Sequence, residues 1–109
     1  MHLCFYRYIV LIKELKDPDE NIRAGAAGIL GIQYSDKPEL VDIMIDLLDD
    51  EHWKVKVSAA YCLGLIGARA ERALPKLKAL LLLPELESRE KERETVSNAI
   101  DIIRKDSEK

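Results

Sequence analysis

The sequence predicts an all-α fold, a right-handed α-solenoid of three helix pairs with about six helices. The first observation is an internal repeat: a pattern that begins at Ile22 and includes Leu30 returns 33 residues later, at Val55 and Leu63. A repeat period in the thirties is typical of stacked supersecondary units. The second observation is helical spacing, because Val55, Leu63 and Ile66 fall on one face of a helix. Together these observations predict helix pairs that bury their apolar faces on one another.

The chain has room for one domain, residues 1–109, which we divide into units at about 5–33, 36–67 and 70–105. We expect helices at about residues 5–16, 18–32, 37–48, 53 to between 64 and 67, 73–83 and 89–105. Aligning Ala59 with Ala99 gives a spacing of 40, so about seven residues are inserted in the third unit. Asp106 to Lys109 are expected to form a frayed tail.

The expected helices differ in the faces they bury. In the first helix, one stripe faces the second unit: Tyr8, Leu11, Ile12 and Leu15. The second helix is expected to begin after an N-cap at Asp17, with Pro18 in its first position. Gly25 and Gly28 are expected to mark a close approach between helices, although they could also be tolerated weak positions.

Composition excludes several classes of function. The net charge of -3 argues against a nucleic-acid partner, which would require a basic excess. No stretch is long and apolar enough to span a membrane. Cys4 and Cys62 have no metal-site spacing, so both are expected to be reduced, buried thiols in a cytoplasmic protein. Few amide and many charged residues are also the pattern of thermophile proteins.

Acidic residues gather before the second and fourth helices, and they could be read as metal ligands. Negative charge at a helix N-terminus is favoured by the helix dipole, so capping explains these residues without a metal. If the turns lie on one side of the stack, they form one negative ridge: Asp17, Asp19, Glu20, Asp49, Asp50 and Glu51. His52 stands alone in a turn, and no residue pattern indicates a catalytic, cofactor-binding or metal site.

The repeated motif resembles the HEAT repeat family. It reads Ile22-Arg23, Ala26-Ala27 and Leu30-Gly31 in the first unit, and Val55-Lys56, Ala59-Ala60 and Leu63-Gly64 in the second. The closest type is the short HEAT-like repeat of phycobilisome bilin lyase subunits. The resemblance covers about residues 5–105 and is weak in the third unit, where no Leu-Gly follows the last helix. Lys56 replaces the usual Arg, which weakens the expected charge ladder between turns. The resemblance implies second helices that line a concave binding surface, and no catalytic residues.

We therefore expect a non-enzymatic protein–protein interaction or scaffold module without a cofactor. The alternative is an accessory subunit of a lyase or another modifying enzyme, similar to the bilin lyases. The candidate partner-binding residues come from an outward helix face, an aromatic first turn, the acidic turns and the first helix: Val57, Tyr61, Trp53, Asp19, Glu51, Phe5 and Ile9.

The first helix also suggests a homodimer, because it is apolar on more than one face. Phe5 and Ile9 lie off the stripe that faces the second unit, so another copy could cover them. The alternative is that these side chains fold down over the Ala- and Gly-rich second helix.

Overall fold

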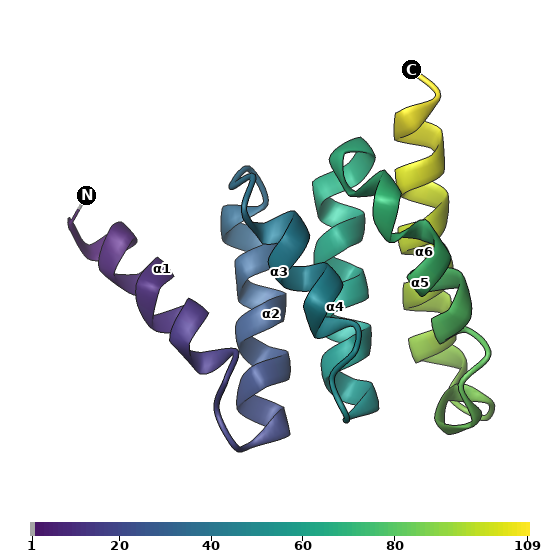
Figure 1. Ribbon diagram of the computed structural model, residues 1–109, viewed down its shortest axis with the longest axis horizontal. Helices are drawn as coiled ribbons and strands as arrows, with labels where there is room; N and C mark the ends of the chain where they lie inside the picture. Colours follow the sequence, from purple (N-terminus) through teal and green to yellow (C-terminus); the bar gives the residue numbers. More distant parts are fainter. Residues whose placement is uncertain (1) are drawn as a thin grey trace.

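A computed structural model describes residues 2–109, with side chains from Phe5 onward, so the predicted burial of the Cys4 thiol lies outside the described side chains. Figure 1 shows successive helices packed side by side along an elongated stack. The elements are α1 (His2–Glu14), α2 (Glu20–Tyr34), α3 (Leu40–Leu47), α4 (Trp53–Ile66), the 3-10 helix η1 (Gly67–Ala73), α5 (Leu74–Leu80), the 3-10 helix η2 (Pro84–Leu86) and α6 (Glu90–Ser107). The described residues contain no strand, which confirms the all-α prediction.

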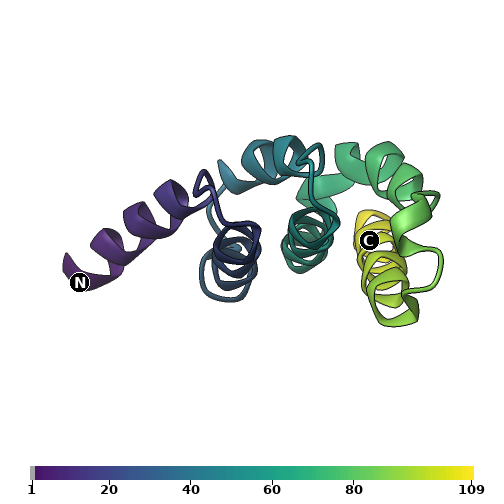
Figure 2. The ribbon, with the colours of Figure 1, turned by 90° about the horizontal axis from the view of Figure 1, so that it is seen from below.

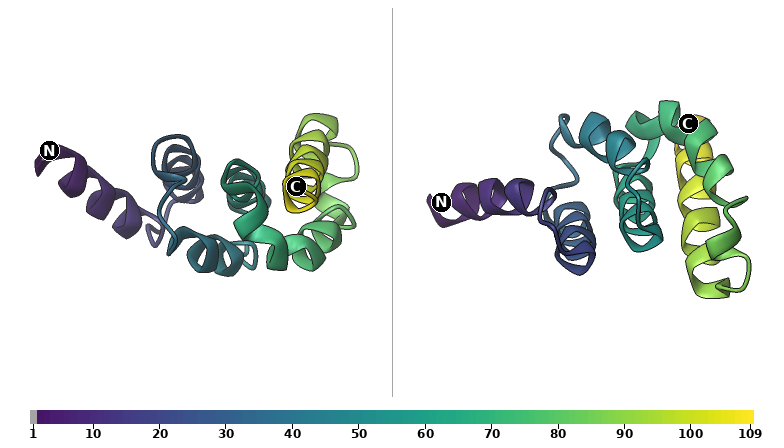
Figure 3. Two further views of the ribbon diagram at one scale, coloured as in Figure 1. Left: turned by 90° about the horizontal axis from the view of Figure 1, so that it is seen from above. Right: turned by 60° about the horizontal axis from the view of Figure 1, so that its bottom comes forward.

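The helices form two layers, with α1, α3 and α5 on the outer, convex side and α2, α4 and α6 on the inner, concave side (Figures 2 and 3). The central helix α4 packs against both α2 and α6, and also against α3. Between the layers lies a core of aliphatic side chains that are fully buried, among them Leu30, Met44, Leu63, Leu77 and Ile103. The described residues include no helix with the length and apolar character needed to cross a membrane.

The predicted stripe on α1 is confirmed, because Leu11 and Leu15 are buried and Tyr8 and Ile12 pack against the core. The N-cap prediction is wrong: α2 begins after Asp19, whose side chain accepts a hydrogen bond from the Asn21 N–H at 2.8 Å. Asp17 instead accepts from the Asp19 N–H at 2.9 Å and so shapes the turn before the helix.

The prediction that Gly25 and Gly28 mark a close helix approach is wrong as well. A Cβ at either position would meet nothing within 4 Å. The close approaches are at Gly31, where a Cβ would lie 2.9 Å from the Cys62 Cα, and at Gly64, where it would lie 2.9 Å from the Ala99 Cβ. These two glycines, one repeat apart, let α2, α4 and α6 pack side by side.

The position of α6 also corrects the predicted spacing of 40. Cys62 packs on Gly31 and Ala99 packs on Gly64, so the residues in the same place on successive helices are 37 apart. Arg93 supports this register, because it donates to the Leu81 carbonyl at 2.8 Å as Arg23 donates to the Asp17 carbonyl at 2.8 Å. The helix is therefore displaced by almost one turn from the sequence alignment.

The C-terminal end is helical where the sequence predicts a frayed tail. Helix α6 runs to Ser107, and an Asp106 carboxylate oxygen accepts a hydrogen bond from the Ala68 N–H at 2.6 Å. Gly67 has a φ of 80°, which turns the chain out of α4 and presents this N–H to Asp106. The last turn of α6 is thus tied to the end of α4.

Candidate functional site

The concave face carries a row of exposed apolar side chains at equivalent positions on its three helices. Ile32, Leu65 and Ile102 are separated by 33 and 37 residues, the same spacings that relate the packed helices. Their exposed fractions are 64%, 42% and 48%. Large apolar side chains that stand alone on a surface are ordinary, but a row across adjacent helices indicates a binding surface. We call these three residues the apolar row.

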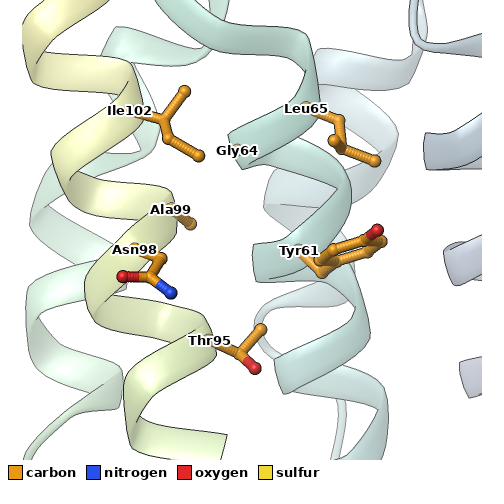
Figure 4. Close-up of a pocket in the computed structure, with 7 residues that line it drawn as sticks. All are labelled: Tyr61, Gly64, Leu65, Thr95, Asn98, Ala99 and Ile102. Atoms are coloured by element: carbon orange, nitrogen blue, oxygen red, sulfur yellow. The ribbon is translucent and has the colours of Figure 1, made fainter.

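A groove of about 200 Å³ lies between α4 and α6 beside this row, as Figure 4 shows. Its lining residues are Tyr61, Gly64, Leu65, Thr95, Asn98, Ala99 and Ile102. Leu65 lies level with Ile102, and Tyr61 lies level with Asn98 (Figure 4). Gly64 lies at the bottom of the groove, where α4 and α6 approach closely and a Cβ would lie 2.9 Å from the Ala99 Cβ. The groove is therefore mainly apolar, with polar groups from α6 along one side.

Two of the polar groups in the groove are free to bind a partner. The Tyr61 hydroxyl and the Asn98 amide form no hydrogen bond with any other described residue. The Thr95 hydroxyl, in contrast, donates to the Lys91 carbonyl one turn earlier at 3.0 Å. An amide and a phenol beside apolar side chains can hydrogen-bond the backbone of a bound peptide.

The opposite end of the concave face is polar. Lys54 of α4 and Lys91 of α6, again 37 residues apart, are both exposed. The Lys54 ammonium donates to the Asn21 side-chain oxygen at 3.1 Å, on the neighbouring α2. The concave face therefore carries exposed lysines near the helix N-termini and apolar side chains near their C-termini.

Tyr61 and Val57, both predicted from the outward side of α4, differ in exposure. Tyr61 lines the groove and is exposed, whereas Val57 is half-buried and packs against the core. Leu65, Ile102, Asn98 and Ile32 are not among the sequence predictions. Ile32 and Leu65 could have been predicted as a pair, because the 33-residue repeat relates them. Ile102 could not, because its equivalence to Leu65 depends on the 37-residue spacing that only the structure shows.

Trp53 lies in the first turn of α4 and is half-buried against the core. The Arg89 guanidinium carbon stands 3.9 Å from the centroid of its indole ring, in a cation–π contact. The Lys54 ammonium lies 5.9 Å from the same centroid. Trp53 thus joins the start of α4 to the turn before α6, away from the groove.

The acidic turns lie at one edge of the stack (Figure 1), but most of their side chains have structural partners. Asp19 caps α2, Asp49 pairs with Lys76 at 2.6 Å, and Asp50 pairs with Arg23 at 3.0 Å. Glu20 lies 3.7 Å from the His52 Nε2. Glu51 is exposed and forms no hydrogen bond or ion pair with another described residue. Little of the predicted negative ridge is therefore free for a partner.

His52 and Cys62, the two other candidates for a chemical role, are both part of the packing and capping of α4. The His52 Nδ1 accepts a hydrogen bond from the Lys54 N–H at 3.1 Å and so caps α4. Cys62 is a free, buried thiol, and this burial raises its pKa to about 12. Within residues 5–109, whose side chains are described, no group of three or more His, Cys, Asp or Glu side chains could hold a metal ion.

On α1, Phe5 and Ile9 are both exposed, with 67% and 37% of their surfaces accessible. Neither is folded down over α2, as the alternative prediction would require. These residues lie at the N-terminal end of the stack, far from the groove between α4 and α6 (Figure 1).

Comparison with known proteins supports the repeat architecture. None of the curated proteins and none of the solved structures matches the chain. The family model for HEAT repeats matches residues 10–105, which is most of the sequence. The match spans the three helix pairs, including the third, whose sequence departs most from the repeated motif. The chain belongs to the HEAT-repeat family.

Proposed function

We propose that this chain is a non-enzymatic protein-interaction or scaffold module of the cytoplasm, which holds a segment of a partner protein across its concave face. HEAT repeats commonly mediate protein–protein interaction. The observation that carries the proposal is the apolar row, Ile32, Leu65 and Ile102, exposed on three adjacent helices. We also propose that the helix pairs stack with a right-handed twist, as the repeat pattern of the sequence predicts.

The chemistry of the face indicates what the partner segment looks like. Apolar side chains of the segment would pack on the apolar row and in the groove beside Tyr61. Acidic side chains on its other edge would face Lys54 and Lys91, which would raise the association rate at low salt. The partner segment is therefore amphipathic, with one apolar and one acidic side.

The alternative role, an accessory subunit of a modifying enzyme, would place a small molecule on this face. A groove of about 200 Å³ is smaller than the roughly 300–1,000 Å³ that is usual for small-molecule sites. The size of the groove thus favours a few side chains of a protein partner over a whole organic ligand.

A peptide-display selection tests the proposal directly. A library of random 15-residue peptides would be selected on the wild-type protein, and the enriched peptides would be titrated against the double variant Leu65→Glu, Ile102→Glu. We expect apolar, acidic peptides whose affinity falls at least about tenfold in the double variant, about 1.4 kcal/mol. Leu82→Glu, at an exposed position on the turn after α5, is the matched control and should leave affinity unchanged.

Two results would reject the concave face as the binding surface. One is a set of enriched peptides that bind the double variant as well as they bind the wild type. The other is a failure to enrich any peptide over an unrelated bait. Duplex DNA at low salt serves as the comparison ligand, and binding to it at least as tight as the peptides would contradict a protein-binding role.

A further inference from the structure

A small pocket lies between the second and third helix pairs, at the edge of the stack where the chain turns after α3 and after α5 (Figure 1). Its volume is about 130 Å³. Apolar and charged side chains line it together, among them Leu48, Asp49, Lys56, Lys76, Leu80 and Leu83. None of them lines the groove on the concave face, so the pocket is a second site, independent of the surface proposed for the partner segment.

One repeat earlier, the equivalent position holds an ion pair. Arg23 of α2 pairs there with Asp50, which follows α3, and a shift of 33 residues turns these two into Lys56 and Leu83. The backbone of the turn repeats as well, because the Asp50 and Leu83 N–H groups each donate to the carbonyl three residues earlier, at 3.1 and 3.2 Å. The second position therefore keeps its cation but has lost the carboxylate.

The cation at this position has no partner within the described part of the chain. Lys56 is half-buried, and its ammonium forms no hydrogen bond or ion pair with another described residue. The Asp49 carboxylate also lines the pocket, but Lys76 pairs with it at 2.6 Å. A charge that is partly removed from water is costly unless an opposite charge or a polar group pairs with it. The pocket therefore lacks one negative charge.

The walls of the pocket indicate which anion fits. Asp50 accepts from Arg23 with both carboxylate oxygens, each at 3.0 Å, so the space between adjacent units accommodates a carboxylate. Leu48, Leu80 and Leu83 offer apolar contacts to the methylene or methyl groups that carry it. The volume is well below the roughly 300–1,000 Å³ that is usual for small-molecule sites. The pocket thus suits one acidic side chain or one small anion.

We propose that this pocket binds a carboxylate from outside the chain, which pairs with Lys56 as Asp50 pairs with Arg23. Two sources offer this group: an acidic side chain of a protein partner and a small free carboxylate anion. Either one would join the second unit to the third at this edge, as the ion pair joins the first unit to the second.

An NMR titration of the ¹⁵N-labelled protein at pH 7 tests the proposal, with sodium chloride keeping the ionic strength constant. Sodium acetate represents a free anion, and N-acetylglutamate α-amide presents the side chain of a protein. We expect saturable shifts of the amide signals around the pocket, with a dissociation constant of roughly 1–10 mM for the better probe, because a ligand of so few atoms gains little binding energy. The probe that binds more tightly identifies the source of the carboxylate.

A variant of Lys56 shows whether its charge carries the binding. Lys56→Met keeps the apolar stem and should weaken binding of the better probe at least about tenfold. Lys78→Met, at an exposed position on α5 outside the pocket, is the matched control and should bind as the wild type does. Circular dichroism would establish that each variant keeps its helix content, and Lys56→Gln would replace a Lys56→Met variant that did not.

A carboxylate built into the chain provides a second measurement. Leu83→Asp places the acid at the position equivalent to Asp50, and Leu83→Asn has the same size without the charge. At pH 7 the Asp variant should unfold at a higher urea concentration than the Asn variant, and Lys56→Met should abolish this difference. Leu83→Asp should also no longer bind acetate, because its own carboxylate occupies the pocket.

Four results would overturn the proposal. The first is the absence of saturable shifts up to about 100 mM of either probe, and the second is equal binding by a folded Lys56 variant. The third is equal stability of the two Leu83 variants. The fourth is tighter binding of inorganic phosphate than of both carboxylates, which would make the pocket a general anion site.

Discussion

Arg23 and Asp50 join the first helix pair to the second through two parallel hydrogen bonds. The Nε atom of Arg23 donates to one carboxylate oxygen of Asp50 at 3.0 Å, and an Nη atom donates to the other at 3.0 Å. The second Nη atom donates to the carbonyls of Asp17 and Pro18, at 2.8 and 3.1 Å. Both side chains are almost wholly buried, with 10% and 12% of their surfaces exposed. The planar guanidinium suits this forked geometry better than a lysine would.

The first prediction concerns the pH dependence that Asp50 gives to stability. Burial raises the pKa of Asp50, whereas hydrogen bonds from Arg23 and from the His52 N–H lower it. The lowering effect is the larger of the two, so the pKa of Asp50 in the folded protein lies below its usual value. The stabilisation is therefore present above the unfolded pKa of about 4 and is lost as the pH falls through the folded value. Asp50→Asn should be less stable than the wild type at pH 7, and this difference should shrink at pH 3.

Urea unfolding at the two pH values measures this difference. Asp101→Asn, at an exposed position on α6 where no ion pair with another described residue is formed, is the control and should match the wild type at both pH values. A deficit in Asp50→Asn that is the same at pH 3 as at pH 7 would show that the ionised pair contributes nothing.

The same pair shows how far the sequence predicts the fold. The helix pairs could be predicted because apolar residues recur at helical spacing, and the faces they form can be buried only when the helices pack on one another. The Arg23–Asp50 ion pair is not repeated between the second and third units. Lys56, at the position equivalent to Arg23, forms no ion pair with another described residue, and Leu83 occupies the position equivalent to Asp50. The displacement of α6 could not be predicted, because it depends on the conformation of the turn that contains η2.

The candidate site was predictable only in part, and for a related reason. Tyr61 follows from its outward position on α4. The groove beside Tyr61 depends on how closely α4 and α6 pack. Gly64 allows a close approach between helices, whereas Gly25 and Gly28 lie at no such approach. Gly31 and Gly64 recur at the repeat spacing while Gly25 and Gly28 do not, and this recurrence is the signal that distinguishes them.

The second prediction uses two glycines of α2 as a matched pair. Gly28→Ala should stabilise the protein by up to about 1 kcal/mol, because alanine favours the helix and its Cβ meets nothing within 4 Å. Gly31→Ala should destabilise it by roughly 1–3 kcal/mol, because its Cβ would lie 2.9 Å from the Cys62 backbone. Thermal melts should move in opposite directions, and a shift in the same direction would contradict the packing at Gly31.

The third prediction compares two leucines of α4. Leu63 is fully buried at the centre of the core, so Leu63→Ala should cost about 2–5 kcal/mol. Leu65 is exposed on the concave face, so Leu65→Ala should change stability by less than about 0.5 kcal/mol. Denaturant unfolding measures both. Similar losses at the two positions would mean that α4 is rotated from the orientation described.

The last prediction concerns the Cys62 thiol, which packs where α4 meets Gly31. A Cβ at Gly31 would lie 3.2 Å from the Cys62 Sγ, so the sulfur has little free space. Burial raises the pKa of this thiol to about 12, which leaves almost no thiolate at pH 8. In a Cys4→Ser background, a disulfide reagent should therefore react with the native protein at least about a hundredfold more slowly than with the unfolded chain. Adding Gly31→Ala should accelerate the native reaction, because the new methyl group pushes α2 and α4 apart at this point. A native rate equal to that of the unfolded chain would show that the contact between α2 and α4 opens freely.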